Sequence, residues 1–126
     1  MATFAIHTLL HSSVLVRDTQ SALAFYHGVL GMSIDLDRPD LGYPGAWLRI
    51  GQQQFHLLEL PNPDPTSGRP AHGGRDRHTA MAVTSLAALQ QTLDQAGIVY
   101  SLSRSGRRAL FCRDPDGNAL EFIETH

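Results

Sequence analysis

The stretch HSSVLVRDTQSALAFYHGVLG, residues 11–31, contains one strand and one helix in a form that the chain later repeats. Its first part belongs to a segment rich in Leu and Val, residues 6–16, which is typical of a strand. Asp18 then offers a side-chain oxygen that can cap a helix, and Gly31 is a residue at which a helix can end. We therefore predict a helix over residues 19–30, with apolar side chains at helical spacing at Leu23, Tyr26 and Leu30.

Three short strands are expected to follow this helix. The sequence indicates them at residues 32–37, 46–50 and 54–60, with a loop containing Pro and Gly at residues 38–45. The first half of the chain therefore has the predicted order β-α-β-β-β.

The same order returns in the second half, beginning with HTAMAVTSLAALQQTLDQAG at residues 78–97. Ser85 is the expected helix cap and Gly97 the expected helix end, and strands are predicted at residues 98–103, 108–113 and 118–124. We therefore predict an α+β fold in a single domain, residues 1–126, in which two tandem βαβββ modules share a core. Module 1 covers about residues 5–60 and module 2 about 78–124, joined by a linker loop at 61–77 that holds four of the seven prolines.

Composition limits the partners that this chain can have. It has 126 residues, 42% of them apolar, with 10 Lys and Arg against 12 Asp and Glu, for a net charge of −2. Without a basic excess the chain is not expected to bind nucleic acid. No apolar run is long enough for a membrane span, and the N-terminal sequence does not resemble a secretory signal. Together with the lone Cys112, this predicts a cytoplasmic protein.

Each half carries a His in its first strand and a Glu in its last, and these four residues are the candidate metal ligands. Aligning the halves sets His11 on His78, 67 residues apart, and Glu59 on Glu121, 62 residues apart. Two imidazoles and two carboxylates suit an octahedral divalent cation with open positions better than a closed structural zinc site. Small residues next to them on the same strand faces leave room for an ion and a ligand, at Ser13, Ala80 and Ala119.

Other residues compete for a place in the site. His56 lies on the opposite strand face from Glu59, so only one of them can point to a common site, and the repeat favours Glu59. The remaining histidines have no repeat partner and are interpreted as surface residues, with a ligand contact from the loop as the alternative for His72. Three arginines surround Gly106 in a turn, either as a solvated tip or as a weaker candidate site for an anionic substrate: Arg104, Arg107 and Arg108.

The residues also carry a resemblance to a known family. HSSVLVRD at 11–18 resembles the first module of the vicinal oxygen chelate superfamily, and RHTAMAV at 77–83 with DPDGNALEF at 114–122 resembles the second. This superfamily contains glyoxalase I, fosfomycin-resistance proteins, bleomycin-resistance proteins and extradiol dioxygenases. The resemblance implies paired βαβββ modules that curve into a mixed-sheet cleft holding a metal, and a homodimer whose sites take ligands from both chains.

The resemblance also implies residues and a reaction. The glyoxalase I ligands fall at His11, Glu59, His78 and Glu121, whereas fosfomycin-resistance members would use His11, His78 and Glu121. The implied function is a glyoxalase-like lyase or isomerase that depends on a divalent ion (Ni, Zn, Mn, Co or Fe). It would stabilise an oxyanion or enediolate of a small oxygenated substrate, with Glu121 as the catalytic base. The alternatives are an epoxide-opening transferase or hydrolase of the fosfomycin-resistance kind, and a metal-free binding protein of the bleomycin-resistance kind.

Overall fold

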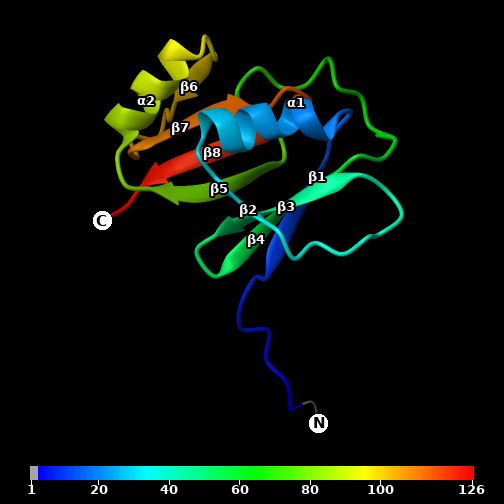
Figure 1. Cartoon of the computed structure of the whole chain (residues 1–126). Coiled ribbons are helices and arrows are strands. Elements are labelled where there is room, and N and C mark those ends of the chain that lie inside the picture. The colour runs from blue at the N-terminus through cyan, green and yellow to red at the C-terminus, as the bar shows by residue number, and fades with distance from the viewer. Residues whose placement is uncertain (1–2) are drawn as a thin grey trace.

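The chain folds into two four-stranded sheets, with one helical segment packed on the first sheet and another on the second, as the computed structural model of residues 3–126 shows (Figure 1). The first module contains β1 (His11–Leu15), α1 (Thr19–Leu23), the π-helical turn Ala24–Val29 that continues it, β2 (Ser33–Asp35), β3 (Gly45–Ile50) and β4 (Gln53–Leu58). The second contains β5 (His78–Val83), α2 (Leu86–Gln95), β6 (Tyr100–Leu102), β7 (Ala109–Arg113) and β8 (Ala119–Glu124). The predicted α+β class and the repeated βαβββ order are confirmed.

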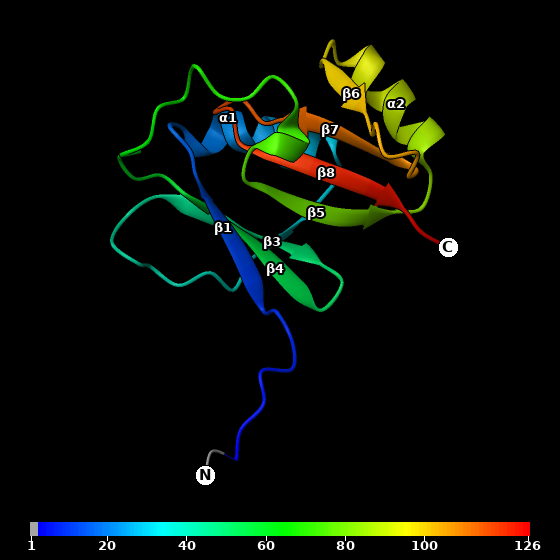
Figure 2. The same ribbon diagram turned by 180° about the vertical axis from the view of Figure 1, so that it is seen from behind.

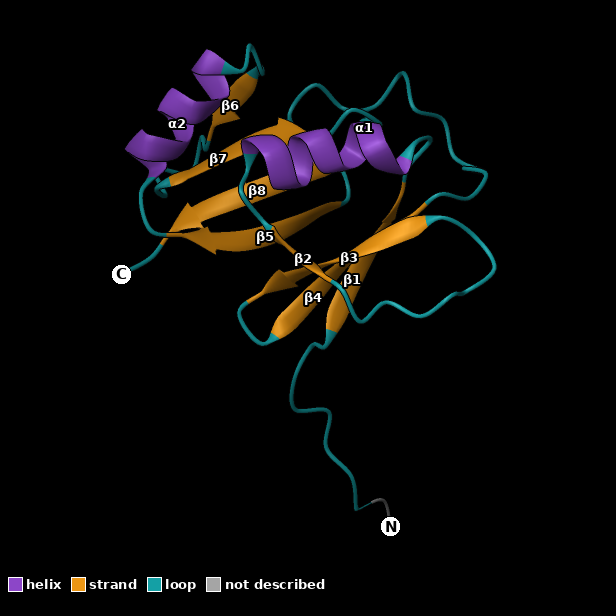
Figure 3. Cartoon of the chain, viewed as in Figure 1, coloured by secondary structure: helices purple, strands orange, loops and turns teal. Residues whose placement is uncertain are grey.

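Both sheets have the same topology. The strand orders are β1-β4-β3-β2 and β5-β8-β7-β6, and in each sheet the first strand pairs in parallel with the last while the other pairs are antiparallel (Figure 3). The helix of each module makes the crossover that the parallel pair requires. The linker adds only a single 3-10 turn, Gly73–Arg75, in agreement with its proline content.

The helix ends follow the predicted chemistry. The Asp18 carboxylate accepts a hydrogen bond from the Gln20 backbone N–H at 2.9 Å, and the Ser85 hydroxyl accepts one from the Ala88 N–H at 3.1 Å. Gly31 and Gly97 have positive φ angles of 74° and 70°, which side chains other than Gly rarely adopt. No helix in residues 3–126 is both long and apolar enough to cross a membrane.

The first strand is shorter than predicted. It begins at His11 rather than near Ile6, because β4 offers pairing partners only from Gln53 onward. Residues 3–10 extend away from both sheets (Figure 2), and the side chains of Phe4 and Ile6 are 78% and 92% exposed. An apolar run is therefore not sufficient for a strand when no neighbouring strand is within reach.

One hydrophobic core extends through both modules. Its fully buried members come from the first module's helix and sheet and from the second module's helix and sheet: Tyr26, Leu48, Phe55, Leu57, Leu93, Leu110 and Leu120. α1 contacts β3 and β4 of its own sheet, and the core continues from there into the second module. The two modules therefore share their buried apolar side chains.

A buried hydrogen bond joins the modules inside this core. The Tyr26 hydroxyl donates to the Asp114 carboxylate at 2.7 Å, and the Asn118 side chain donates both to that carboxylate at 2.8 Å and to the Leu15 carbonyl at 3.1 Å. Burial raises the pKa of Asp114, and burial together with the Asp114 carboxylate raises the pKa of Tyr26 well above its ordinary value. The turn at residues 114–117 thus connects the second module to the first helix and to β1.

Replacing Tyr26 by Phe tests this connection. The substitution removes one donor from a buried carboxylate and should lower the free energy of unfolding by about 2 kcal/mol, as measured by chemical denaturation. Tyr43→Phe is the matched control, because the Tyr43 hydroxyl has no hydrogen bond within residues 3–126. Equal losses in the two variants would show that the Tyr26 hydroxyl does not stabilise the pairing of the modules.

Candidate active site

The second module brings a histidine and a glutamate together on one face of its sheet. His78 Nε2, at the start of β5, lies 3.2 Å from Glu121 Oε1 on β8. The other carboxylate oxygen, Oε2, accepts a hydrogen bond from Arg107 at 2.9 Å. The Glu121 side chain is 4% exposed, so this carboxylate is buried but fully partnered. The structure therefore places two of the four expected metal ligands, His78 and Glu121, in direct contact.

The orientation of the His78 ring follows from its second contact. Its Nδ1 lies 2.9 Å from the Asp76 carbonyl oxygen, which can only accept, so Nδ1 carries the hydrogen. In the neutral ring the Nε2 lone pair then faces the Glu121 oxygen. Metal-bound histidines commonly have this arrangement, in which a backbone carbonyl orients the ring and the other nitrogen faces the ion. The donor atoms present fit a divalent cation, although one chain supplies only two of them here.

Asp76 holds the linker in the position that orients His78. Its carboxylate accepts hydrogen bonds from Arg69 and Arg113, each at 2.8 Å, and a further one from the Arg77 backbone N–H. These contacts, that of Arg69 foremost, lower the pKa of Asp76 to about 2. The end of the linker and the start of β5 are therefore anchored to β7.

The first module presents a stack of three rings on its open face. The His56 ring lies between His11, with ring centres 4.0 Å apart, and Trp47, with ring centres 4.5 Å apart. His56 Nε2 lies 2.9 Å from the Gln54 side-chain oxygen, and Gln54 in turn donates to the buried Asp35 carboxylate at 2.8 Å. Burial, followed by the neighbouring His11, lowers the pKa of His56, so this ring is held neutral.

The structure corrects the expected place of Glu59. Its Oε1 accepts a hydrogen bond from the Thr19 backbone N–H at 2.8 Å, which places the carboxylate at the start of α1 and not beside His11. Glu124 does the same for α2, accepting from the Leu86 N–H at 3.0 Å. Both carboxylates satisfy free backbone donors at a helix N-terminus.

The register of the strands explains this correction. Ser13 pairs with His56 in the first sheet as Ala80 pairs with Glu121 in the second. The last strands of the two modules, β4 and β8, therefore match at a spacing of 65 residues in the sequence and not 62. His56 takes the position of Glu121, and Glu59 takes that of Glu124. The match at 62 aligned two residues of the same type, Glu59 and Glu121, although they occupy different positions in their sheets.

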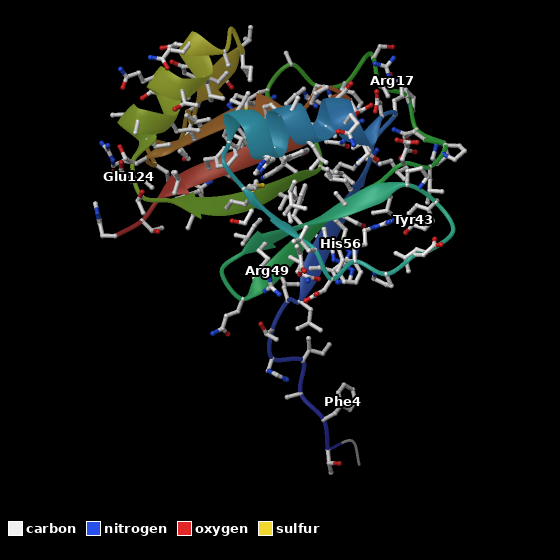
Figure 4. The ribbon with its side chains drawn as sticks, in the orientation of Figure 1. Phe4, Arg17, Tyr43, Arg49, His56 and Glu124 are labelled. Carbon is white, nitrogen blue, oxygen red and sulfur yellow. The ribbon has the colours of Figure 1, made fainter. Side chains whose placement is uncertain are left out.

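The two half-sites of one chain do not meet. Ser12 Oγ and Thr79 Oγ1 lie 3.4 Å apart between the sheets, and neighbouring strand residues point to opposite faces. His11 and His78 are therefore directed away from this contact, each onto an exposed face. Within residues 3–126 no three His, Cys, Asp or Glu side chains could hold one metal ion. Figure 4 shows His56 and Arg49 on the first sheet, remote from Glu124 in the second module.

The three candidate arginines do not all lie at the same site. Arg107 contacts Glu121, and Arg104 lines the same pocket, which has a volume of about 240 Å³. Arg108 instead pairs with Glu124 at the other end of β8, so it does not line this pocket. His72 and Arg75 from the linker also line it. The sequence indicated His72 only as an alternative and Arg75 not at all, because their position depends on how the linker folds back over β7.

Comparisons with known proteins agree with this architecture. The family model for the Glyoxalase/Bleomycin resistance protein/Dioxygenase superfamily matches residues 8–122. A protein of Arabidopsis thaliana named Glyoxylase I 4 is 34% identical over 120 residues, which cover 90% of this chain and 68% of the relative.

Two solved structures share the fold. A glyoxalase family protein from Bacillus anthracis has a TM-score of 0.82 at 24% identity, covering 99% of this chain and 100% of the other. TnmS3, an antibiotic binding protein from Streptomyces sp. CB03234, has a TM-score of 0.75 at 20% identity, covering 98% and 100%. At these identities the likeness shows the fold alone, and this fold serves both a glyoxalase family protein and a binding protein.

The role of Glu59 leads to a mutational prediction. Glu59→Ala removes an acceptor at the start of α1 and should lower the free energy of unfolding by about 1 kcal/mol, measured by chemical denaturation. Glu124→Ala should cause a loss of similar size at α2. Neither substitution should change the affinity for a divalent ion, and a loss of metal binding in Glu59→Ala would contradict the assignment.

The anchoring role of Asp76 predicts a pH dependence. Because its pKa is lower in the folded chain, at about 2, than its ordinary value of 3.8, the stability from its ionised form is present above pH 3.8. That stability is lost as the pH falls towards 2. The difference in Tm between the native chain and Asp76→Asn should therefore shrink between pH 5 and pH 2, as thermal denaturation at a series of pH values would measure. A constant difference would contradict this.

Proposed function

The chain belongs to the Glyoxalase/Bleomycin resistance protein/Dioxygenase superfamily, and from this premise we propose that it is a divalent-metal-dependent enzyme of the lyase or isomerase type. Its substrate would be a small molecule with a carbonyl next to the carbon that loses a proton. The observation that carries the proposal is the pair formed by His78 Nε2 and Glu121 Oε1 at 3.2 Å. Two donor atoms at this separation can bind the same cation side by side, and the cation then neutralises the buried carboxylate.

A second copy of the chain would complete the site. His78 and Glu121 provide two ligands, and His11 lies on an exposed face of the other module. In a symmetric dimer each site would combine His11 of one chain with His78 and Glu121 of the other. The open faces of both sheets, together with the exposed N-terminal residues Phe4 and Ile6, support such an assembly.

The residues around the pair then have separate tasks. When bound, a divalent ion supplies a Lewis acid for substrate oxygens and stabilises negative charge on them. Glu121 would take a proton from a carbon beside the carbonyl. Arg107 is 58% exposed at its side chain, so it can leave Glu121 Oε2 and contact the developing oxyanion. Phe111 lies edge-on to the His78 ring, with ring centres 5.6 Å apart, and limits the access of water from that side.

The stacked rings of the first module favour a second candidate function. Trp47, His56 and His11 form a face-to-face stack whose outer ring faces belong to His11 and Trp47, and aromatic ring faces bind planar compounds by stacking. On this reading the chain is a metal-free binding protein that holds a planar compound between two copies. The two functions differ in whether His78 and Glu121 bind an ion.

Metal analysis distinguishes the metal-dependent enzyme from the metal-free binding protein. Protein purified without an affinity tag should contain close to one equivalent of a divalent ion per chain, or take it up from Ni, Zn, Mn or Co in calorimetric titrations. His78→Ala and Glu121→Gln should each lower the affinity at least about 100-fold, and Glu59→Ala is the matched control. Less than about a tenth of an equivalent, not restored by any of these ions, would contradict the metalloenzyme and favour the binding protein.

Mixing two inactive variants tests the shared site. His11→Ala and Glu121→Gln chains each lack a ligand in every site of their own dimers. After mixing and reassociation, about half of the dimers are mixed and each has one intact site, so about a quarter of the metal-binding sites should return. Recovery measured by metal titration supports a site made from two chains. No recovery, with mixed dimers shown by mass spectrometry, would contradict it.

A further inference from the structure

The pocket beside Glu121 is unusually rich in cationic groups. It lies between the linker turn Gly73–Arg75, the turn after β6 and the open face of β7, and its volume is about 240 Å³. Its lining contains one carboxylate, that of Glu121. It also contains five side chains that are cationic or can become cationic: His72, Arg75, His78, Arg104 and Arg107. A ligand that enters from solvent towards Glu121 therefore meets a positive field.

The arginines of this pocket differ from the others in the chain. The ten Lys and Arg residues of the chain are all arginines, and the side chains of eight of them donate a hydrogen bond or form an ion pair. The two without any such partner among residues 3–126 are Arg75 and Arg104, and both line this pocket. Two unpaired guanidinium groups that line one pocket repel each other, and a bound anion offsets that repulsion.

His72 adds an independent observation. Its Nδ1 accepts a hydrogen bond from the Gly74 backbone N–H at 3.0 Å, so the neutral ring carries its hydrogen on Nε2. Nε2 is buried and has no partner in the described part of the chain. A buried donor without an acceptor is costly, and an oxygen of a bound ligand would satisfy it. The ring packs on Phe111, with centres 4.7 Å apart, which holds it at the pocket wall.

We propose that this pocket binds an oxyanion group of the substrate, a carboxylate or a phosphate, through Arg75, Arg104 and Nε2–H of His72. The inference rests on the proposed function, because it takes the reacting carbon to lie beside Glu121, which lines the same pocket. Guanidinium groups recognise both anions by paired hydrogen bonds. The substrate class would then be small oxo-acids or phosphate esters of small carbonyl compounds, and neutral carbonyl compounds would bind weakly.

Anion binding to the metal-free protein tests the pocket separately from the metal. Sodium phosphate and sodium acetate are titrated at constant ionic strength with chloride, and binding is followed by the nitrogen NMR signals of the His72 ring. The variant Arg75→Gln/Arg104→Gln should bind at least about tenfold more weakly, because two charge-assisted contacts are lost. Arg17→Gln is the matched control, since Arg17 is 90% exposed and does not line this pocket.

Each outcome decides the proposal. A phosphate response that needs Arg75 and Arg104 supports a phosphate-bearing substrate, and an acetate response with the same dependence supports a carboxylate. No response of the His72 ring to either anion would overturn the proposal, as would equal affinities in the double variant and the native chain, or an equal loss in Arg17→Gln. The double variant should bind divalent ions like the native chain. Anion binding without any metal binding would overturn the proposed enzyme and leave the pocket assignment intact.

Discussion

The buried contact between Tyr26 and Asp114 determines how the two modules face each other. Tyr26 comes from the helix of the first module and Asp114 from the turn before the last strand of the second, and their bond at 2.7 Å lies inside the common core. Asn118 extends the same network to the end of β1. Because a buried carboxylate needs all of these donors, the modules have little freedom to rotate without losing them.

This packing decides where chemistry can occur. The face of each sheet that bears the helix is buried in the shared core, and the contact between Ser12 and Thr79 lies on that face. The opposite faces remain open and carry the stack around His56 and the pair of His78 with Glu121. A single chain therefore presents two incomplete surfaces, and the proposed metal site needs a second copy to become complete.

On the open face of the second sheet, the two carboxylate oxygens of Glu121 have different environments. One lies next to His78 and the other next to Arg107. The linker that crosses this surface brings His72 and Arg75 next to it, and the Asp76 carboxylate fastens that linker to Arg113 of β7. The linker, which the sequence predicts to be only a loop between the modules, thus both anchors His78 and supplies cationic side chains to a pocket.

The sequence by itself determined the α+β class, the repeated βαβββ order and the helix ends, because strand and helix periodicity, Asp18, Ser85 and the two terminal glycines act locally. It also indicated His78 and Glu121 as two of four candidate metal ligands, the others being His11 and Glu59. It did not determine which residue of β4 matches Glu121, since a shift of three positions preserves the apolar pattern closely enough to align Glu59. Only the pairing of Ser13 with His56 and of Ala80 with Glu121 decided that match, and only the tertiary packing decided which sheet faces stay open. Strand register and the folding of a linker over a sheet depend on contacts between residues far apart in the chain, and local sequence does not encode those contacts directly.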